Sequence, residues 1–131
     1  MDELPIRTGD DVVRVRQQVR VVAAKTGLSL VDQTKVVTAA SELARNALVH
    51  GGGGLARVEV VTSALGKSGV RIGFTDEGPG IADVDLALTD GWTTGGGLGL
   101  GLSGARRLVD EFELNSKPGA GTSVMVVKWS R

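Results

Sequence analysis

The hydrophobic period of this 131-residue chain changes at a run of four glycines, residues 51–54. Before the run, apolar residues recur at intervals of three and four, which predicts amphipathic helices. The first helix ends at Gly27, and the second begins at Ser29 or Asp32 and ends near His50. After the run, apolar and polar residues alternate, as they do in half-buried strands. The chain must therefore fold into a structure that combines helices and a sheet.

The positions of the strands suggest a two-layer architecture. We expect strands over residues 56–65 and 70–78, and a closing hairpin over residues 113–130 that turns at Pro118-Gly119. Three further segments are an edge strand over residues 4–7, a short helix or loop over 81–91, and a helix over 102–112. This order predicts a single α/β (α+β) two-layer sandwich over residues 1–131. Its mixed, mostly antiparallel sheet is covered on one face by helices.

The composition narrows the function classes. Lysine plus arginine equals aspartate plus glutamate at 15 each, which gives no attraction to nucleic acid or membrane. The chain has no cysteine, which excludes disulfides and thiolate metal sites. No signal peptide or apolar run of about 18 residues is visible, so we expect a cytoplasmic domain. Basic residues crowd the first helix, as a solvated face or as a surface for a partner.

The second predicted helix carries Glu42, Asn46 and His50 at intervals of four, so they share one face. A carboxylate and an amide beside a core suit a metal–phosphate site, because Mg²⁺ takes oxygen ligands and keeps several waters. Glu42 would be placed to accept a proton from an attacking hydroxyl. The alternative is an ordinary exposed polar face.

Asp76 ends a predicted strand and begins the sequence Asp-Glu-Gly-Pro-Gly. A carboxylate fixed there can accept a hydrogen bond from an exocyclic amine such as that of adenine. Gly78 and Gly80 would let a flat ring approach the backbone closely. The alternative is a tight turn capped by an aspartate.

Residues 90–107 hold seven of the chain's 20 glycines, alternating in part with leucines. The stretch contains G-x-G-x-x-G, but no strand precedes it and no acidic residue follows at the required distance, so a dinucleotide-binding loop is excluded. A P-loop is excluded because Gly-Lys-Ser/Thr is absent. What remains is a glycine-rich loop that enters a helix and attracts phosphate through backbone N–H groups.

Together, residues 42–46, 76–80 and 95–101 resemble the N, G1 and G2 boxes of the GHKL ATPases, whose ATP-binding domain is the Bergerat fold. That superfamily includes gyrase, heat-shock chaperones, histidine kinases and anti-sigma-factor kinases. Within it, nearly the whole chain is similar to the RsbT-type switch serine/threonine protein kinases, a branch of the anti-sigma-factor kinase family. The segments that carry this similarity are residues 31–46, 90–116 and 128–131.

The resemblance implies ATP and Mg²⁺ as cofactors and assigns roles to residues. Glu42 would be the general base, and Asn46 would hold Mg²⁺. Asp76 would bind the adenine amine, and Gly80 and Thr122 would lie near the adenine and contact it through a water molecule. The other expected nucleotide contacts are Gly78, Ile81, Thr94, Gly95, Gly96, Gly97, Leu98, Gly99, Leu100, Gly101 and Leu102. Residues 91–104 contain no lysine or arginine, so the γ-phosphate would depend on backbone N–H groups, Mg²⁺, and Arg106 or Arg107.

The resemblance also implies partners. The substrates would be STAS-domain antagonist or scaffold proteins in a partner-switching stress response, and the released kinase would activate a regulator phosphatase. An anti-sigma factor that mainly binds a sigma factor is the alternative. A detached histidine-kinase domain is disfavoured, because it needs a helical segment with a phosphorylated histidine and His50 is the only histidine.

Overall fold

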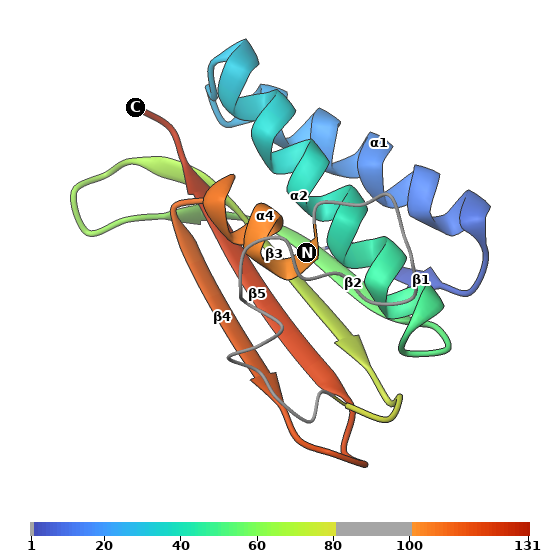
Figure 1. Ribbon diagram of the computed structural model, residues 1–131. Coiled ribbons are helices and arrows are strands. Elements are labelled where there is room, and N and C mark those ends of the chain that lie inside the picture. The colour runs from blue at the N-terminus through green and yellow to red at the C-terminus, as the bar shows by residue number, and fades with distance from the viewer. Residues whose placement is uncertain (1, 81–100) are drawn as a thin grey trace.

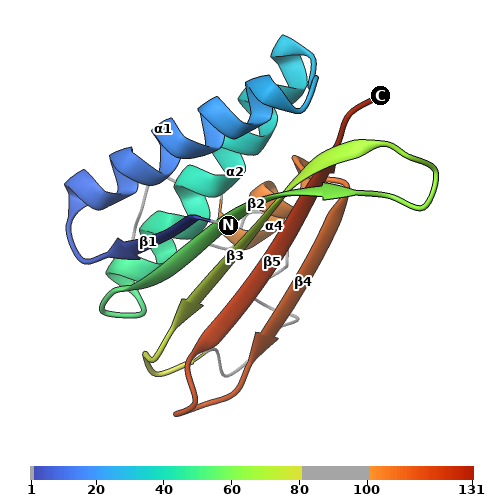
Figure 2. The same ribbon diagram turned by 180° about the vertical axis from the view of Figure 1, so that it is seen from behind.

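The computed structural model describes residues 2–80 and 101–131 as a sheet with helices on one face (Figure 1). In chain order the elements are β1 (Asp2–Ile6), α1 (Gly9–Lys25), α2 (Leu30–Val49), β2 (Gly54–Thr62), β3 (Ser68–Asp76), α4 (Gly101–Arg107), β4 (Glu111–Ser116) and β5 (Thr122–Trp129). Seen from behind, the other face of the sheet carries none of these helices (Figure 2). The predicted two-layer sandwich is confirmed.

The five strands lie in the order β1-β2-β3-β5-β4, so the last strand in sequence lies between two earlier ones. Each described pairing is antiparallel, where the sequence allowed a mixed sheet. The connection from β3 to β4 includes α4 and returns the chain to the far edge of the sheet. β5 then fills the space between β3 and β4.

Side-chain caps fix where the two long helices begin. The Thr8 hydroxyl accepts a hydrogen bond from the Asp11 N–H, and the Asp11 carboxylate accepts one from the Thr8 N–H, which is a capping box. At α2, the Ser29 hydroxyl accepts from the Asp32 N–H at 3.1 Å. Ser29 is therefore the N-cap, and of the two predicted starts the earlier one is correct.

The helix predicted over residues 102–112 is wrong at its C-terminal end. α4 ends at Arg107, and the Leu108 N–H closes a last turn on the Ala105 carbonyl. The Asp110 N–H then donates to the carbonyl of Val127, which brings the chain to the sheet before Glu111. The hairpin predicted over residues 113–130 therefore begins two residues earlier, at Glu111 of β4, because Glu111 and Phe112 continue the alternation of the strand.

The predicted strands are found with shifted ends. The strand expected over residues 56–65 is β2, and the strand expected over 70–78 is β3, which stops at Asp76. The turn of the closing hairpin contains Pro118 and Gly119, as predicted, and the Ala120 N–H donates to the Lys117 carbonyl.

The core lies between the sheet and the helices and is built largely from valine and alanine. The largest fully buried side chains are Ile6, Leu43, Ile72, Val15, Val19, Val36, Val58, Val70 and Val126. The apolar residues that recur at intervals of three and four along α2 are buried, at Val36, Ala40, Leu43 and Ala47. None of the described helices is long and apolar enough to cross a membrane.

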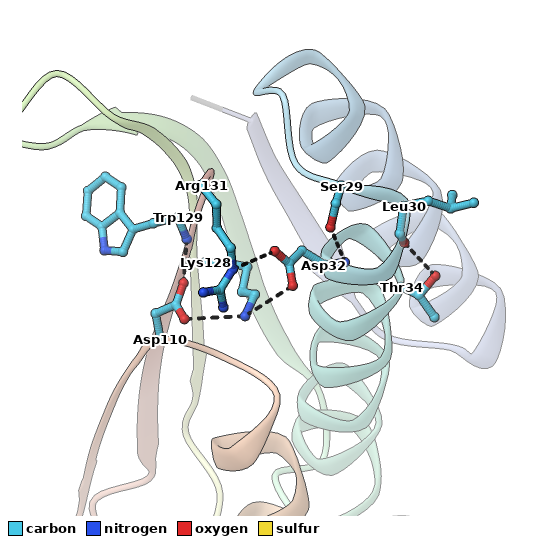
Figure 3. A network of polar contacts seen from close by, with 8 residues as sticks. All are labelled: Ser29, Leu30, Asp32, Thr34, Asp110, Lys128, Trp129 and Arg131. Atoms are coloured by element: carbon cyan, nitrogen blue, oxygen red, sulfur yellow. Dashed lines mark hydrogen bonds and ion pairs between the residues drawn. The ribbon is translucent and has the colours of Figure 1, made fainter.

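A buried ionic network joins the beginning of α2 to the end of β5 (Figure 3). Lys128 faces the helices with 3% of its surface exposed, and its Nζ lies 3.6 Å from Asp32 and 3.3 Å from Asp110. The Arg131 guanidinium lies 3.2 Å from the other oxygen of Asp32. Asp110 also accepts from the Trp129 N–H at 2.7 Å. Asp32 and Lys128, the two buried charges of this network, thus lie beside opposite charges, which offsets the cost of removing them from water.

Two opposing effects set the pKa of Asp32. Burial raises the pKa of this carboxyl, while the hydrogen bond from Arg131 and the charges of Lys128, Arg131 and Lys35 lower it by more. The pKa of Asp32 therefore lies below its ordinary value.

We predict that Asp32→Ala lowers the free energy of unfolding by about 3 kcal/mol, because it removes one partner of a buried lysine. The matched control is Glu3→Ala, which breaks an ion pair with Arg57 whose side chains are both more than half exposed. That change should cost less than about 1 kcal/mol. Urea denaturation of both variants measures the difference, and equal losses would contradict a buried network.

The network also predicts a pH dependence. A carboxyl whose pKa is lowered by folding contributes stability above its unfolded pKa and loses that contribution as the pH falls through its folded pKa. The stability difference between the wild type and Asp32→Asn should therefore be full at neutral pH and shrink below the ordinary aspartate pKa of 3.8. Urea denaturation across this range measures it, and a difference that is constant with pH would refute the assignment.

Candidate nucleotide site

The register of the sheet places Asp76 at the centre of one end. It pairs with Gly54 of β2 on one side and with Thr122 of β5 on the other. Ile72 and Phe74 precede it at alternate positions and are buried against the helices. Asp76 therefore faces the helix layer, as its predicted role requires.

A second pair of polar residues, Thr122 and Ser116, extends from Asp76 toward the edge of the sheet. Ser116, at the end of β4, pairs with Thr122, and their hydroxyl oxygens are 2.9 Å apart. The Ser116 hydroxyl also donates to the Gly121 carbonyl at 3.0 Å. Sequence reasoning found Thr122 but missed Ser116. The alternation of Phe112, Leu114 and Ser116 along β4 would have placed Ser116 on the same face.

Two residues further along the strands, the same face is apolar. Phe74 pairs with Val124, and Val124 pairs with Leu114 across the next ladder. Phe74 and Val124 are both at most 5% exposed. Hydroxyls and a carboxylate thus border the apolar core at this end of the sheet.

The helix α2 supplies the other predicted residues. Glu42 is 9% exposed, and its Oε1 accepts a hydrogen bond from the Gly101 N–H, at the start of α4, at 3.0 Å. Asn46 lies one turn further along and is half-buried, with no side-chain hydrogen bond inside the described ranges. His50 is the exposed C-cap of the helix, and its N–H donates to the Asn46 carbonyl.

Glycines close the end of the sheet around Asp76. The Gly78 N–H donates to Asp76 Oδ1 at 2.9 Å, which fixes the turn that follows β3. Gly80 has a φ of +76°, and a Cβ on it would collide with the Lys117 carbonyl oxygen. The Gly119 N–H donates to the Pro79 carbonyl at 2.7 Å. These glycines permit the two turns to pack together; the room for a ring that we expected beside them stays a prediction.

A groove of about 990 Å³ opens at this end of the sheet. Its lining comes from four segments, residues 51–55, 75–77, 114–117 and 120–123. The groove brings together Asp76, Thr122 and Ser116, whereas Glu42, Asn46 and Gly101 do not line it.

Much of the predicted glycine-rich loop lies outside the described residues. This applies to Ile81 and to seven further predicted contacts, which are Thr94, Gly95, Gly96, Gly97, Leu98, Gly99 and Leu100. Gly101 begins α4 with a φ of +71°, and Leu102 is 8% exposed in the core. Leu102 therefore anchors the beginning of α4 in the core, and its expected contact with nucleotide stays a prediction. Arg106 and Arg107 are both exposed.

Comparison with known proteins identifies a matching family. Residues 31–130 match the family described as histidine kinase-, DNA gyrase B- and HSP90-like ATPase. The serine/threonine-protein kinase RsbT of Bacillus subtilis (strain 168) is 47% identical over 126 residues, which cover 96% of this chain and 94% of RsbT. The anti-sigma F factor of Thermoanaerobacter sp. (strain X514) is 28% identical over 117 residues, 87% of this chain and 82% of that protein.

Solved structures show the same fold. The structure of the RsbU and RsbW domains of a Mycobacterium tuberculosis protein aligns with a TM-score of 0.64 at 25% identity. The alignment covers 100% of this chain but 33% of that one, so this chain spans about a third of its length. The mycobacterial sensor histidine kinase MprB aligns with a TM-score of 0.55 at 17% identity and covers 99% of this chain and 97% of that one.

The chain therefore belongs to the histidine kinase-, DNA gyrase B- and HSP90-like ATPase family, and like other members it uses ATP. Its identity to RsbT over nearly the full length of both proteins makes it, within that family, a serine/threonine protein kinase.

We predict that Gly80→Ala destabilises the domain more than Gly66→Ala. Both glycines have φ near +80°, so both substitutions carry the backbone strain of about 1 kcal/mol. Only at Gly80 would the added methyl also meet protein, since nothing lies within 4 Å at Gly66. Thermal or urea unfolding of the two variants isolates the packing contribution, and equal losses would show that the two turns are not in contact.

Proposed function

We propose that this kinase transfers the γ-phosphoryl group of ATP to a serine of a STAS-domain antagonist or scaffold protein in a partner-switching pathway. Once released from that protein, it would activate a regulator phosphatase. The observation that carries the proposal is the 47% identity to RsbT across 96% of the chain. The presence of a carboxylate at Glu42, beside the start of α4, supports a catalytic role over binding alone.

Asp76 is proposed to recognise adenine. Its Oδ1 accepts the Gly78 N–H, while Oδ2 has no hydrogen-bond partner within residues 2–80 and 101–131. Oδ2 would accept from the exocyclic amine, and Thr122, directly across the ladder, would act through a water. Leu114 lines the same groove as Asp76 and would supply an apolar contact for the ring.

Asn46 is proposed as the protein ligand of Mg²⁺. The described ranges contain no group of three or more acidic, histidine or cysteine side chains that could hold a metal. One amide oxygen with phosphate oxygens and waters fits Mg²⁺, which keeps several waters and takes few protein ligands. Bound there, Mg²⁺ would neutralise phosphate charge.

Glu42 is proposed as the general base. The serine oxygen forms a bond to the γ-phosphorus, and the bond from that phosphorus to ADP breaks with its electrons remaining on ADP. The hydroxyl proton passes to the Glu42 carboxylate. The Gly101 N–H holds Oε1, so the carboxylate is oriented by the start of α4 and Oε2 is the oxygen that would accept the proton.

A second candidate function is supported by the anti-sigma F factors, which are 28–30% identical over 87% of this chain. In this alternative the chain acts mainly by binding a sigma factor. A pull-down from native cells distinguishes the two, because a sigma factor as the principal partner would favour the alternative and a STAS-domain protein would favour the proposed kinase role.

We predict that Glu42→Gln lowers phosphotransfer by at least about 100-fold, the usual contribution of a general base, while ATP still binds. Glutamine keeps an oxygen that can accept the Gly101 N–H, so the orientation of α4 is preserved and the loss reports proton transfer. The assay incubates the kinase with labelled ATP and candidate STAS-domain proteins and follows label on serine, with ATP affinity measured separately.

The control is Glu113→Gln, at an exposed position on β4, which should leave transfer unchanged. Transfer at the wild-type rate by Glu42→Gln would exclude Glu42 as the base. Label on a histidine instead of a serine would contradict the proposed acceptor.

A further inference from the structure

Gly51, the first residue after the C-cap of α2, packs its backbone directly on the side chain of Asp76. A Cβ built on Gly51 would lie 2.6 Å from Asp76 Cβ, would meet the carboxyl carbon as well, and would lie 2.7 Å from the Ala47 carbonyl oxygen. The φ of Gly51 is not positive. Glycine is therefore required at this position for space and not for backbone conformation.

Gly78 completes the enclosure from the other side. A Cβ on Gly78 would lie 2.6 Å from the Cα of Gly51, so the two backbones are in direct contact. The Gly78 N–H also donates to Asp76 Oδ1. The carboxylate of Asp76 thus lies against the Gly51 backbone and is held by the Gly78 N–H, which leaves little rotational freedom.

We propose that Gly51 is a positioning residue that fixes the carboxylate of Asp76 and thereby sets the selectivity for a purine that carries an exocyclic amine. This inference rests on the proposed function of Asp76 as the adenine acceptor. A side chain at position 51 would displace the carboxylate of Asp76, because it would meet both the Cβ and the carboxyl carbon of that residue. The displacement would weaken the hydrogen bond from Gly78 and move Oδ2 away from the base.

The same contact ties base recognition to the catalytic helix. Gly51 is bonded to the end of α2, where its N–H donates to the Asn46 carbonyl. The Gly53 N–H donates to the Ala47 carbonyl at 2.9 Å, which holds the segment after the helix in place. The carboxylate of Asp76 is therefore set relative to the helix that carries Glu42 and Asn46.

The test measures equilibrium affinity for two nucleotides, ATP and the triphosphate of purine riboside, which lacks the exocyclic amine. Gly51→Ala should weaken ATP binding by about tenfold or more, the contribution of one hydrogen bond to a charged group. The affinity for purine riboside triphosphate should change little. The matched control is Gly73→Ala, which also lacks a positive φ and has nothing within 4 Å of an added Cβ. It should leave both affinities unchanged.

Asp76→Gly provides the background that separates the two claims, because it removes the two Asp76 atoms that a side chain at position 51 would meet and leaves only the contact with the Ala47 carbonyl. In that background Gly51→Ala should have no further effect on the preference for ATP. It should also cost less unfolding free energy than in the wild type, a readout that needs no nucleotide.

An equal loss of both nucleotides in Gly51→Ala, or losses that simply add in the double variant, would overturn the role of Gly51. If Asp76→Gly itself leaves the preference for ATP intact, the proposed adenine acceptor is wrong. The smaller unfolding cost of Gly51→Ala in the Asp76→Gly background would then still report the packing contact. If Gly51→Ala does not fold, recovery of folding in the double variant supports that contact, and failure of both to fold contradicts it.

Discussion

The pairing register of β3 with its two neighbours is the constraint on which the site depends. Because side chains alternate along a strand, a shift of one residue would turn Asp76 to the outer face and bring Thr75 inward. The register is secured by the burial of Ile72 and Phe74, which would lose their core contacts in the same shift. Hydrophobic packing of the sheet thus determines the position of a carboxylate that is itself only half-buried.

The two ends of α2 differ in how their polar side chains are held, because Asp32 is paired with charged groups and Asn46 is not. At its first turn, Asp32 is 4% exposed and is held by Lys128 and Arg131, so that end is fixed to the last strand by charge. Near its last turn, Asn46 is left with a side chain that no other described group engages. Anchoring one end of a rigid helix lets the other present polar groups in a fixed position without bonding them to the protein.

The helices, the two-layer fold and most strands could be predicted, because caps and hydrophobic periods are local properties of the sequence. The residues proposed to contact nucleotide were found through motifs, and of these Asp76 and Thr122 do meet in one groove. The packing of Gly51 on Asp76 could not be predicted, since it joins the end of a helix to the end of a strand 25 positions later in the sequence. The burial of Lys128 could not be predicted either, because its partners Asp32 and Asp110 come from distant segments.

The place of β5 between β3 and β4 has a consequence for how the domain forms during synthesis. Ribosomes release the chain from its N-terminus, so β1, β2 and β3 can pair as a three-stranded antiparallel sheet as soon as they emerge. β4 emerges next, but among the described strands its sole partner is β5. We therefore expect β3 and β4 to expose unpaired edges until β5 leaves the exit tunnel. That interval is when a nascent chain of this fold is most open to aggregation or chaperone capture.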